Sequence, residues 1–180
     1  MRHDSPNLLE SRSNVSESSE LHRAFIGLGS NIDPEINLVR AVRKLDEKTV
    51  LVKVSNVYQT PPIGGLGGDF LNATALVLTP LPAAELKEKI LYAIENELGR
   101  IRTEDPNFPR TIDLDILIYD RTVLEEALWS LPHLCVPTSE LIPDIKDPKS
   151  GRRLASEARQ LIMKSPIKKY PLNLHWRSTP

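Results

Sequence analysis

Two aspartates separated by a single residue, Asp113 and Asp115, are the side chains in this chain best suited to chemistry. The segment around them alternates polar and aliphatic residues and then turns apolar, which predicts a strand over 112–119. Successive strand side chains point to opposite faces, so both carboxylates share a face, roughly 6.5–7 Å apart, while Leu114 points into a core. Such a pair suits Mg²⁺, which takes one or two carboxylates together with waters and phosphate oxygens. The alternative interpretation is a half-exposed edge strand with solvated aspartates.

Three arginines, Arg100, Arg102 and Arg110, precede these aspartates closely in the sequence. Guanidinium groups grip phosphate oxygens, and carboxylates hold the metal ion that a polyphosphate carries. Phosphoryl-type transfer depends mostly on positioning and electrostatics, so this set of residues is sufficient for it. The alternative is structural: the same arginines would form salt bridges with the aspartates or with Glu104.

Length and charge exclude several classes of protein. The chain has 180 residues, enough for one domain with a sizeable core. Lysine and arginine number 23 against 24 aspartates and glutamates, and this balance lacks the basic footprint of a nucleic-acid-binding protein. No apolar stretch approaches the roughly 20 residues that a membrane span needs. Cys135 is the sole cysteine, so no internal disulfide forms, which suits a reducing cytoplasm.

The two ends of the chain differ from its middle in composition. Residues 1–22 are rich in Ser, Asn, Glu and Arg with almost no apolar periodicity, and we expect a disordered tail. Residues 23–164 carry the motifs and the periodic segments of one domain. Residues 165–180 are rich in proline and are expected to be an extended C-terminal arm, to which the sequence assigns no chemistry.

Within the middle segment, the hydrophobic pattern predicts strands and helices in mixed order. Pro34 is placed to open the first helix, and Gly99 stands where a glycine ends the second. Such a mixture fits an α/β sandwich. Strands are expected at 24–28, 50–58, 69–78 and 112–119, helices at 34–48, 82–98 and 152–163, and loops at 59–68 and 101–109.

Several motifs together give the chain a family resemblance. The run Arg-Thr-Ile-Asp-Leu-Asp-Ile-Leu at 110–117 closely resembles the signature of 6-hydroxymethyl-7,8-dihydropterin pyrophosphokinase, an enzyme family of folate biosynthesis. The resemblance runs from about residue 24 to about residue 161, with the motifs in the family's order. The other matching segments are Phe25–Asn31, Tyr58–Gly64, Asp69–Ala73, Ile94–Arg100, Leu131–His133, Val136–Pro137 and Ile142–Asp144.

The resemblance implies a fold, a reaction and a location. The fold is expected to be a ferredoxin-like α/β sandwich, mainly antiparallel, with helices on both sides. The implied reaction transfers the terminal diphosphate of ATP to 6-hydroxymethyl-7,8-dihydropterin and releases AMP. The implied location is cytoplasmic, with no nucleic-acid or membrane partner, and with the next enzyme of the folate pathway as a partner to consider.

The resemblance also implies roles for individual residues. Two Mg²⁺ ions are expected on Asp113 and Asp115, which with Arg100 and Arg110 form the candidate catalytic set. The positions that match ATP-binding residues are Arg100, Arg102, Arg110, Ile116 and His133. The positions that match the pterin pocket are Thr60, Pro61, Pro62, Phe70, Asn72 and Glu95.

Residue chemistry agrees with some of these pterin roles but leaves alternatives open. Asn72 carries a donor and an acceptor that suit the amide-like edge of a pterin, or it forms a local backbone bond. Phe70 offers a flat face for stacking, or it is a core aromatic. Thr60 begins a rigid corner with two prolines, which presents its carbonyl to a ligand or only ends a strand. For His133 and Glu95, the alternatives are a structural histidine and a surface charge.

The chain departs from the family after His133. Relatives carry a longer segment there, including an arginine and an aromatic residue that closes over the pterin, whereas here Val136 follows almost at once. One wall of the pterin pocket is therefore expected to be missing unless Trp129, Tyr58 or Phe108 replaces it. Two alternative functions remain open: diphosphate transfer to another hydroxymethyl compound or modified pterin, and a non-catalytic paralogue that binds nucleotide or pterin.

Overall fold

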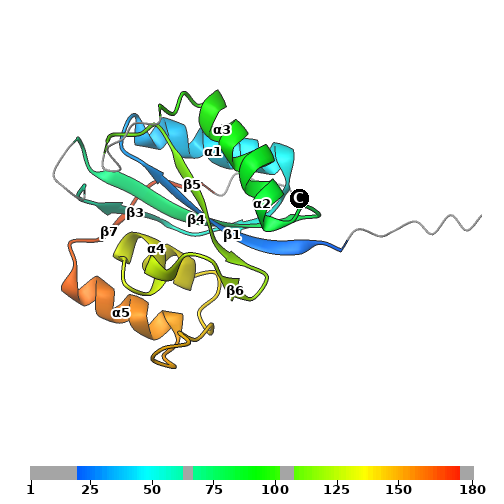
Figure 1. Ribbon diagram of the computed structural model, residues 1–180. Helices are drawn as coiled ribbons and strands as arrows, with labels where there is room; N and C mark the ends of the chain where they lie inside the picture. The colour runs from blue at the N-terminus through cyan, green and yellow to red at the C-terminus, as the bar shows by residue number, and fades with distance from the viewer. Residues whose placement is uncertain (1–19, 63–66, 102–107, 175–180) are drawn as a thin grey trace, which may run out of the picture.

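The computed structural model describes residues 20–62, 67–101 and 108–174, and an antiparallel sheet forms its centre (Figure 1). The strand order is β6–β5–β1–β4–β3–β7, and β2 pairs with β4 along the same edge of β4 as β3. The seven strands are β1 (His22–Ser30), β2 (Val50–Val54), β3 (Val57–Thr60), β4 (Phe70–Thr79), β5 (Asp113–Tyr119), β6 (Thr122–Val123) and β7 (Lys168–Tyr170).

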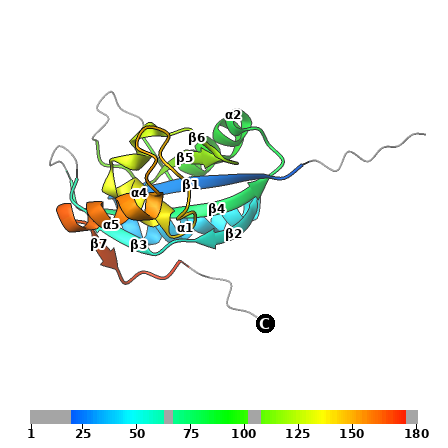
Figure 2. The same cartoon turned by 90° about the horizontal axis from the view of Figure 1, so that it is seen from below.

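Helices cover both faces of this sheet (Figures 1 and 2). On one face lie α1 (Pro34–Lys48) and a continuous helix made of α2 (Ala83–Glu85), the π-helical stretch η1 (Leu86–Leu91) and α3 (Tyr92–Glu97). On the other face lie α4 (Pro132–Ser139) and α5 (Leu154–Lys164), with the 3₁₀ turn η2 (Glu126–Trp129) before α4. This arrangement confirms the predicted α/β sandwich with a mainly antiparallel sheet. Among the described helices, none is both long and apolar enough to cross a membrane.

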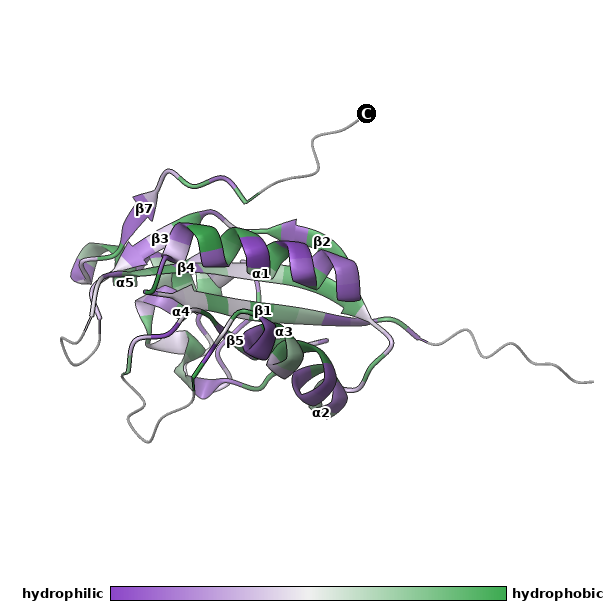
Figure 3. Cartoon of the chain, turned by 90° about the horizontal axis from the view of Figure 1, so that it is seen from above, coloured by the Kyte–Doolittle hydropathy of each residue, from purple (hydrophilic) through white to green (hydrophobic). Residues whose placement is uncertain are grey.

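The first helix shows why the sequence pattern was informative. Pro34 stands at its first turn, where the missing N–H costs nothing, and its apolar stripe of Leu38, Val42 and Leu45 is buried against the sheet. The buried amide of Asn37 donates to the carbonyl oxygen of Ile32 at 2.7 Å, so its polar group is satisfied. In Figure 3, α1 and α2 carry many polar residues, while β1 and β4 are mostly apolar.

A bulge between β1 and β5 divides the apolar residues between two cores. Ile26 of β1 pairs with Ile116, but its neighbour on β1, Phe25, pairs with Ile118. Leu117 is therefore the extra residue of β5. Ile26 and Ile116 belong to the core beneath α1 and α3, whereas Phe25, Leu117 and Ile118 belong to the core beneath α4 and α5. The sheet is therefore buried on both faces.

Some predicted elements differ from the observed ones. The prediction of a single strand over 50–58 is wrong, because Ser55 interrupts it. The N–H of Ser55 donates to the carbonyl oxygen of Thr74, and the Oγ of Ser55 accepts from the N–H of Thr74, both at 2.9 Å. β3 then continues to Thr60, inside the segment predicted as a loop. The elements β6, η2, α4 and β7 were not predicted, because short segments carry little periodicity. The segment 1–19 of the expected disordered tail lies outside the described residues.

We predict that Leu114→Ala destabilises the fold because Leu114 is 1% exposed and anchors the aspartate-bearing strand in the core. The free energy of unfolding is expected to fall by about 2–5 kcal/mol, measured by urea denaturation. The matched control is Leu124→Ala, at a leucine that is 48% exposed, for which a change within about 0.5 kcal/mol is expected. Equal effects of the two variants would contradict the assignment of Leu114 as an anchor.

Candidate active site

The two aspartates of β5 line a cavity of about 540 Å³. Leu114 and Ile116 point the other way, into the core beneath α1 and α3, as the strand pattern predicted. The shared face of Asp113 and Asp115 therefore opens onto a space large enough for a small-molecule ligand.

Two glycines of β1, Gly27 and Gly29, form the floor of this cavity. In the sheet register, Asp113 lies opposite Gly29, and on the other side of Gly29 lies Asn72 of β4. A Cβ atom on Gly29 would stand 3.4 Å from Asn72 Oδ1, and one on Gly27 would stand 3.1 Å from a methyl group of Leu117. The glycines therefore keep the floor open between the aspartates and Asn72. The sequence analysis missed this role, although Gly-Leu-Gly within a strand was the available signal.

Three segments form the walls around this floor. The end of β3 and the start of β4 contribute the residues predicted for the pterin pocket, apart from Glu95. The other two segments are the η2–α4 region and the chain after α5. The wall residues are Thr60, Pro61, Pro62, Phe70 and Asn72 from the first segment, Glu125, Ala127, Leu131, Pro132, His133 and Leu134 from the second, and Ser165, Pro166 and Ile167 from the third.

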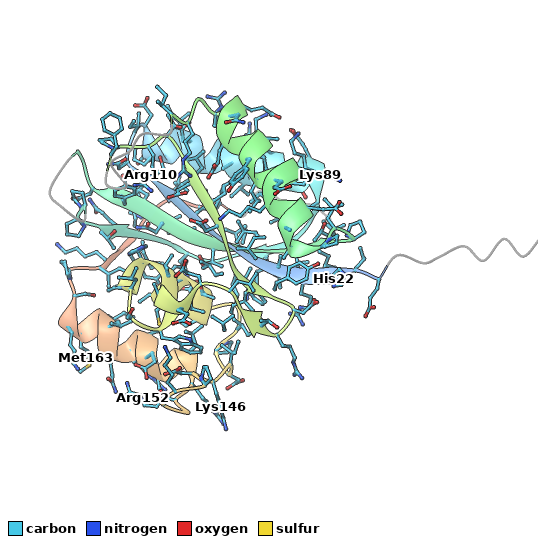
Figure 4. All side chains as sticks on the ribbon, viewed as in Figure 1. His22, Lys89, Arg110, Lys146, Arg152 and Met163 are labelled. Atoms are coloured by element: carbon cyan, nitrogen blue, oxygen red, sulfur yellow. The ribbon has the colours of Figure 1, made fainter. Side chains whose placement is uncertain are left out.

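Asp113 is held between two arginines. Arg100 and Arg110 each donate from Nη1 to its carboxylate, and Arg110 lies three residues before β5 begins (Figure 4). Burial alone would raise the pKa of Asp113, but the two guanidinium groups outweigh it and hold the pKa below its ordinary value. The guanidinium of Arg110 also lies 5.7 Å from the ring centre of Phe70, which connects the charged end of the cavity to its aromatic wall.

Asp115 has a cationic partner that the sequence analysis did not identify. Lys87 Nζ, from the π-helical stretch η1, donates to Asp115 Oδ1 at 2.8 Å. Burial tends to lower the pKa of Lys87, but the hydrogen bond and charge of Asp115 prevail, and the pKa is raised. In sequence, Lys87 is one of two lysines on this helix, with Lys89, so only the three-dimensional structure distinguishes it.

Glu95 and Ile116 occupy different places from those that the resemblance implied. Glu95 is 1% exposed and does not line the cavity; its carboxylate accepts from the N–H of Leu114 at 2.9 Å and from Arg100. It therefore closes the open edge of β5 and helps to position Arg100 behind Asp113. Ile116 lies in the core and not in the cavity lining. Arg102 lies outside the described residues.

The turn after β1 fixes the entry of the chain into β5. Asn31 Oδ1 accepts from the N–H of Arg110 at 2.8 Å, and the N–H groups of Asn31 and Ile32 both donate to the Arg110 carbonyl at 3.2 Å. The hydroxyl of Ser30 donates to the carbonyl of Thr111 at 2.6 Å. The Ser-Asn pair of the opening motif thus holds Arg110 and the aspartates in register.

At the opposite end of the cavity, Asn72 is held by its neighbours. Its Nδ2 donates to Thr60 Oγ1 at 3.0 Å and to the Tyr58 carbonyl at 3.2 Å.

His133, on the first turn of α4, also lines the cavity. Burial lowers the pKa of His133 below its ordinary value, Asp113 opposes this and Arg110 adds to it, so the neutral imidazole is favoured.

None of the aromatic residues expected to replace the missing wall lines the cavity. Trp129 and Tyr58 pack against the core beneath α4 and α5, and the Tyr58 hydroxyl donates to Glu140 at 2.5 Å. Phe108 is 46% exposed. The cavity walls of the described residues are therefore formed by other side chains.

Comparison with known proteins places this fold and site in a family. Residues 25–143 match the family of 7,8-dihydro-6-hydroxymethylpterin-pyrophosphokinase (HPPK), and the chain belongs to that family. Among its relatives, the 2-amino-4-hydroxy-6-hydroxymethyldihydropteridine pyrophosphokinase of Synechocystis sp. is 33% identical over 79% of this chain and 77% of its own length. The Bacillus subtilis protein of the same name is 43% identical over 61% of this chain and 67% of its own length.

Solved structures show the same fold. The crystal structure of a Plasmodium falciparum HPPK-DHPS protein matches with a TM-score of 0.60 and 12% sequence identity, covering 83% of this chain. This chain spans about half of that protein, 47% of its length. The likeness supports the fold of the sheet and helices described above.

We predict that Gly29→Leu blocks the cavity while the fold persists, because the added side chain extends from the floor into open space. Binding of 6-hydroxymethylpterin, measured by calorimetry, is expected to weaken at least about tenfold. Gly29→Ala is the matched control, since its Cβ makes an ordinary 3.4 Å contact with Asn72, and it should bind as the wild type does. Wild-type affinity in a folded Gly29→Leu protein would contradict the role of the glycine floor.

Proposed function

We propose that this protein transfers the terminal diphosphate of ATP to the hydroxymethyl group of 6-hydroxymethyl-7,8-dihydropterin and releases AMP. Its relatives at 33% and 43% identity are named as pyrophosphokinases of this pteridine. The observation that carries the proposal is the row of Asp113, Gly29 and Asn72 across three neighbouring strands. With strands about 4.8 Å apart, a charged end and an amide end lie roughly 10 Å apart across an open floor.

The donor set at the charged end fits Mg²⁺. Asp113 and Asp115 supply hard carboxylate oxygens on one face, and the described residues contain no cluster of three or more potential metal-ligating side chains. Two carboxylates alone leave coordination positions for waters and phosphate oxygens, which is how Mg²⁺ is commonly held in nucleotide sites. Two bound ions would neutralise charge on the transferred group.

The cations around the aspartates support a role in nucleotide binding. Lys87, Arg100 and Arg110 now pair with the two carboxylates. If the two carboxylates held Mg²⁺, these three side chains would be available for the phosphate oxygens of ATP. His133 offers a further hydrogen bond in the same cavity. For Arg102 we keep the nucleotide-binding role that the sequence predicts.

The amide end of the cavity suits a flat heterocycle. The Nδ2 group of Asn72 already donates to Thr60 and Tyr58, so its Oδ1 remains as a fixed acceptor for a ligand without further loss of side-chain freedom. Phe70 supplies an aromatic face beside it, and Pro61 and Pro62 supply a rigid rim. A pterin held here places its hydroxymethyl group towards the phosphates.

The reaction then needs little covalent help from the protein. The hydroxymethyl oxygen forms a bond to the β-phosphorus of ATP, the bond from that phosphorus to the α,β-bridging oxygen breaks, and AMP leaves with that oxygen. The hydroxyl proton is released to solvent. Arg100 and Arg110 stabilise the charge on the transferring group, which is the main requirement for phosphoryl transfer.

We further infer that the enzyme acts in the cytoplasm and supplies its product to the next enzyme of folate biosynthesis. The lone cysteine, buried in the core, is consistent with a reducing compartment. The Plasmodium falciparum proteins of similar fold are named HPPK-DHPS, so their name joins a second unit, DHPS, to HPPK. This supports a functional association between the two activities.

We predict that Asp115→Asn lowers the rate of AMP release by about a thousandfold or more, because one carboxylate of the metal pair is lost. The assay follows AMP and ADP by chromatography after incubation with Mg-ATP and 6-hydroxymethyl-7,8-dihydropterin. Asp144→Asn, at an exposed aspartate outside the cavity, is the matched control and should keep the wild-type rate. A near-normal rate in folded Asp115→Asn, or ADP as the wild-type product, would contradict the proposal.

A further inference from the structure

The chain after α5 forms a wall of the cavity, although the sequence assigned it no chemistry. Ser165, Pro166 and Ile167 all line the cavity, together with Thr60 and Phe70. This segment, here called the 165–167 wall, connects the end of α5 to β7.

The pairing of β7 with β3 places this wall beside the pterin end of the site. Lys168 pairs with Gln59 in antiparallel register, so the next step along both strands brings Ile167 beside Thr60. Thr60 in turn pairs with Phe70 on β4. Two strand spacings, roughly 10 Å, separate the backbones of Phe70 and Ile167. A flat ring lying over Thr60 therefore has Phe70 on one side and the 165–167 wall on the other.

The wall is fixed at both of its ends. Ser165 Oγ donates to the Leu161 carbonyl at 2.6 Å, which ties the wall to the last turn of α5. Ile167 is 7% exposed in the core beneath α4 and α5, and the hydroxyl of Tyr170 donates to Glu35 of α1. Pro166 has a restricted φ between these anchors. The wall thus has a defined position before any ligand arrives.

We propose that Pro166 and Ile167 determine pterin specificity by packing against the bound ring, where the aromatic wall of the family's longer segment is missing. This inference rests on the proposed function. Trp129, Tyr58 and Phe108 do not line the cavity, so none of them forms the wall that faces Phe70. Ser165, Pro166 and Ile167 line the cavity at that position. Aliphatic side chains gain contact area with a ring without imposing a stacking geometry, so small changes in their size alter which ring substituents fit.

The test compares Ile167→Ala and Pro166→Ala with the wild type. The KM for 6-hydroxymethyl-7,8-dihydropterin is expected to rise about tenfold in Ile167→Ala, while the KM for ATP stays unchanged. The ratio of kcat/KM for a 7-methyl-substituted analogue over that of the parent pterin is expected to rise in both variants. Pro166 is exposed, so its variant keeps the test valid if loss of the buried Ile167 side chain unfolds the protein.

The matched control is Met163→Ala, which should leave every parameter unchanged. Met163 lies near the end of α5 (Figure 4), is 82% exposed and does not line the cavity. A lower melting temperature with the same pterin KM and selectivity in folded variants would overturn the inference, while AMP release by the wild type would keep the proposed function. If the wild type releases no AMP, the proposed function fails, and calorimetry with 6-hydroxymethylpterin decides the wall's role. Equal affinity of the wild type and the variants for 6-hydroxymethylpterin, or no binding of it by the wild type, would overturn the role of the 165–167 wall.

Discussion

Two carboxylates on one face of a strand, directly above a hydrophobic core, are costly unless positive charge compensates them. In this protein Arg100 and Arg110 compensate Asp113, and Lys87 compensates Asp115. The buried Glu95 carries a third carboxylate, which pairs with Arg100 from behind the strand. The positions of α3, of η1 and of the chain entering β5 are all tied to this charge balance.

The same strand explains how the site is both rigid and open. Residues of β5 that alternate with the aspartates are buried in the core, so the aspartates have fixed directions. The neighbouring strand β1 presents Gly27 and Gly29 on the cavity side, where side chains would otherwise fill the space. Rigid walls and a floor without side chains reduce the ordering that a ligand must impose, which favours tight and selective binding. Catalysis that depends on positioning benefits from this geometry.

Periodicity and residue type were sufficient to predict the strand of the two aspartates, their shared face and the first helix. Long elements with one clear apolar side are where such patterns are most informative. Other features depend on contacts between distant segments and left no local signal. Lys87 looks like any solvated lysine until η1 is placed against β5, and Glu95 looks like a surface charge until Leu114 and Arg100 are seen around it.

The C-terminal part of the site illustrates the same limit. A three-residue strand in a proline-rich segment has too few residues for a pattern. It pairs with β3, and the preceding Ile167 packs in the core beneath α4 and α5. The glycine floor was visible in the sequence as Gly-Leu-Gly, but its meaning required the register that aligns Gly29 with Asp113 and Asn72. Sequence reasoning thus predicted residues with distinctive side chains better than the glycine floor and the C-terminal wall.

The most direct test of this account is the position of the metal. Crystals of the protein with Mn²⁺, a non-hydrolysable ATP analogue and 6-hydroxymethylpterin allow the metal to be located by anomalous diffraction. Mn²⁺ is expected to be bound by the carboxylates of both Asp113 and Asp115, with Arg100 and Arg110 on phosphate oxygens and the pterin beside Asn72. Metal and nucleotide bound elsewhere, with both arginines still paired to Asp113, would contradict it.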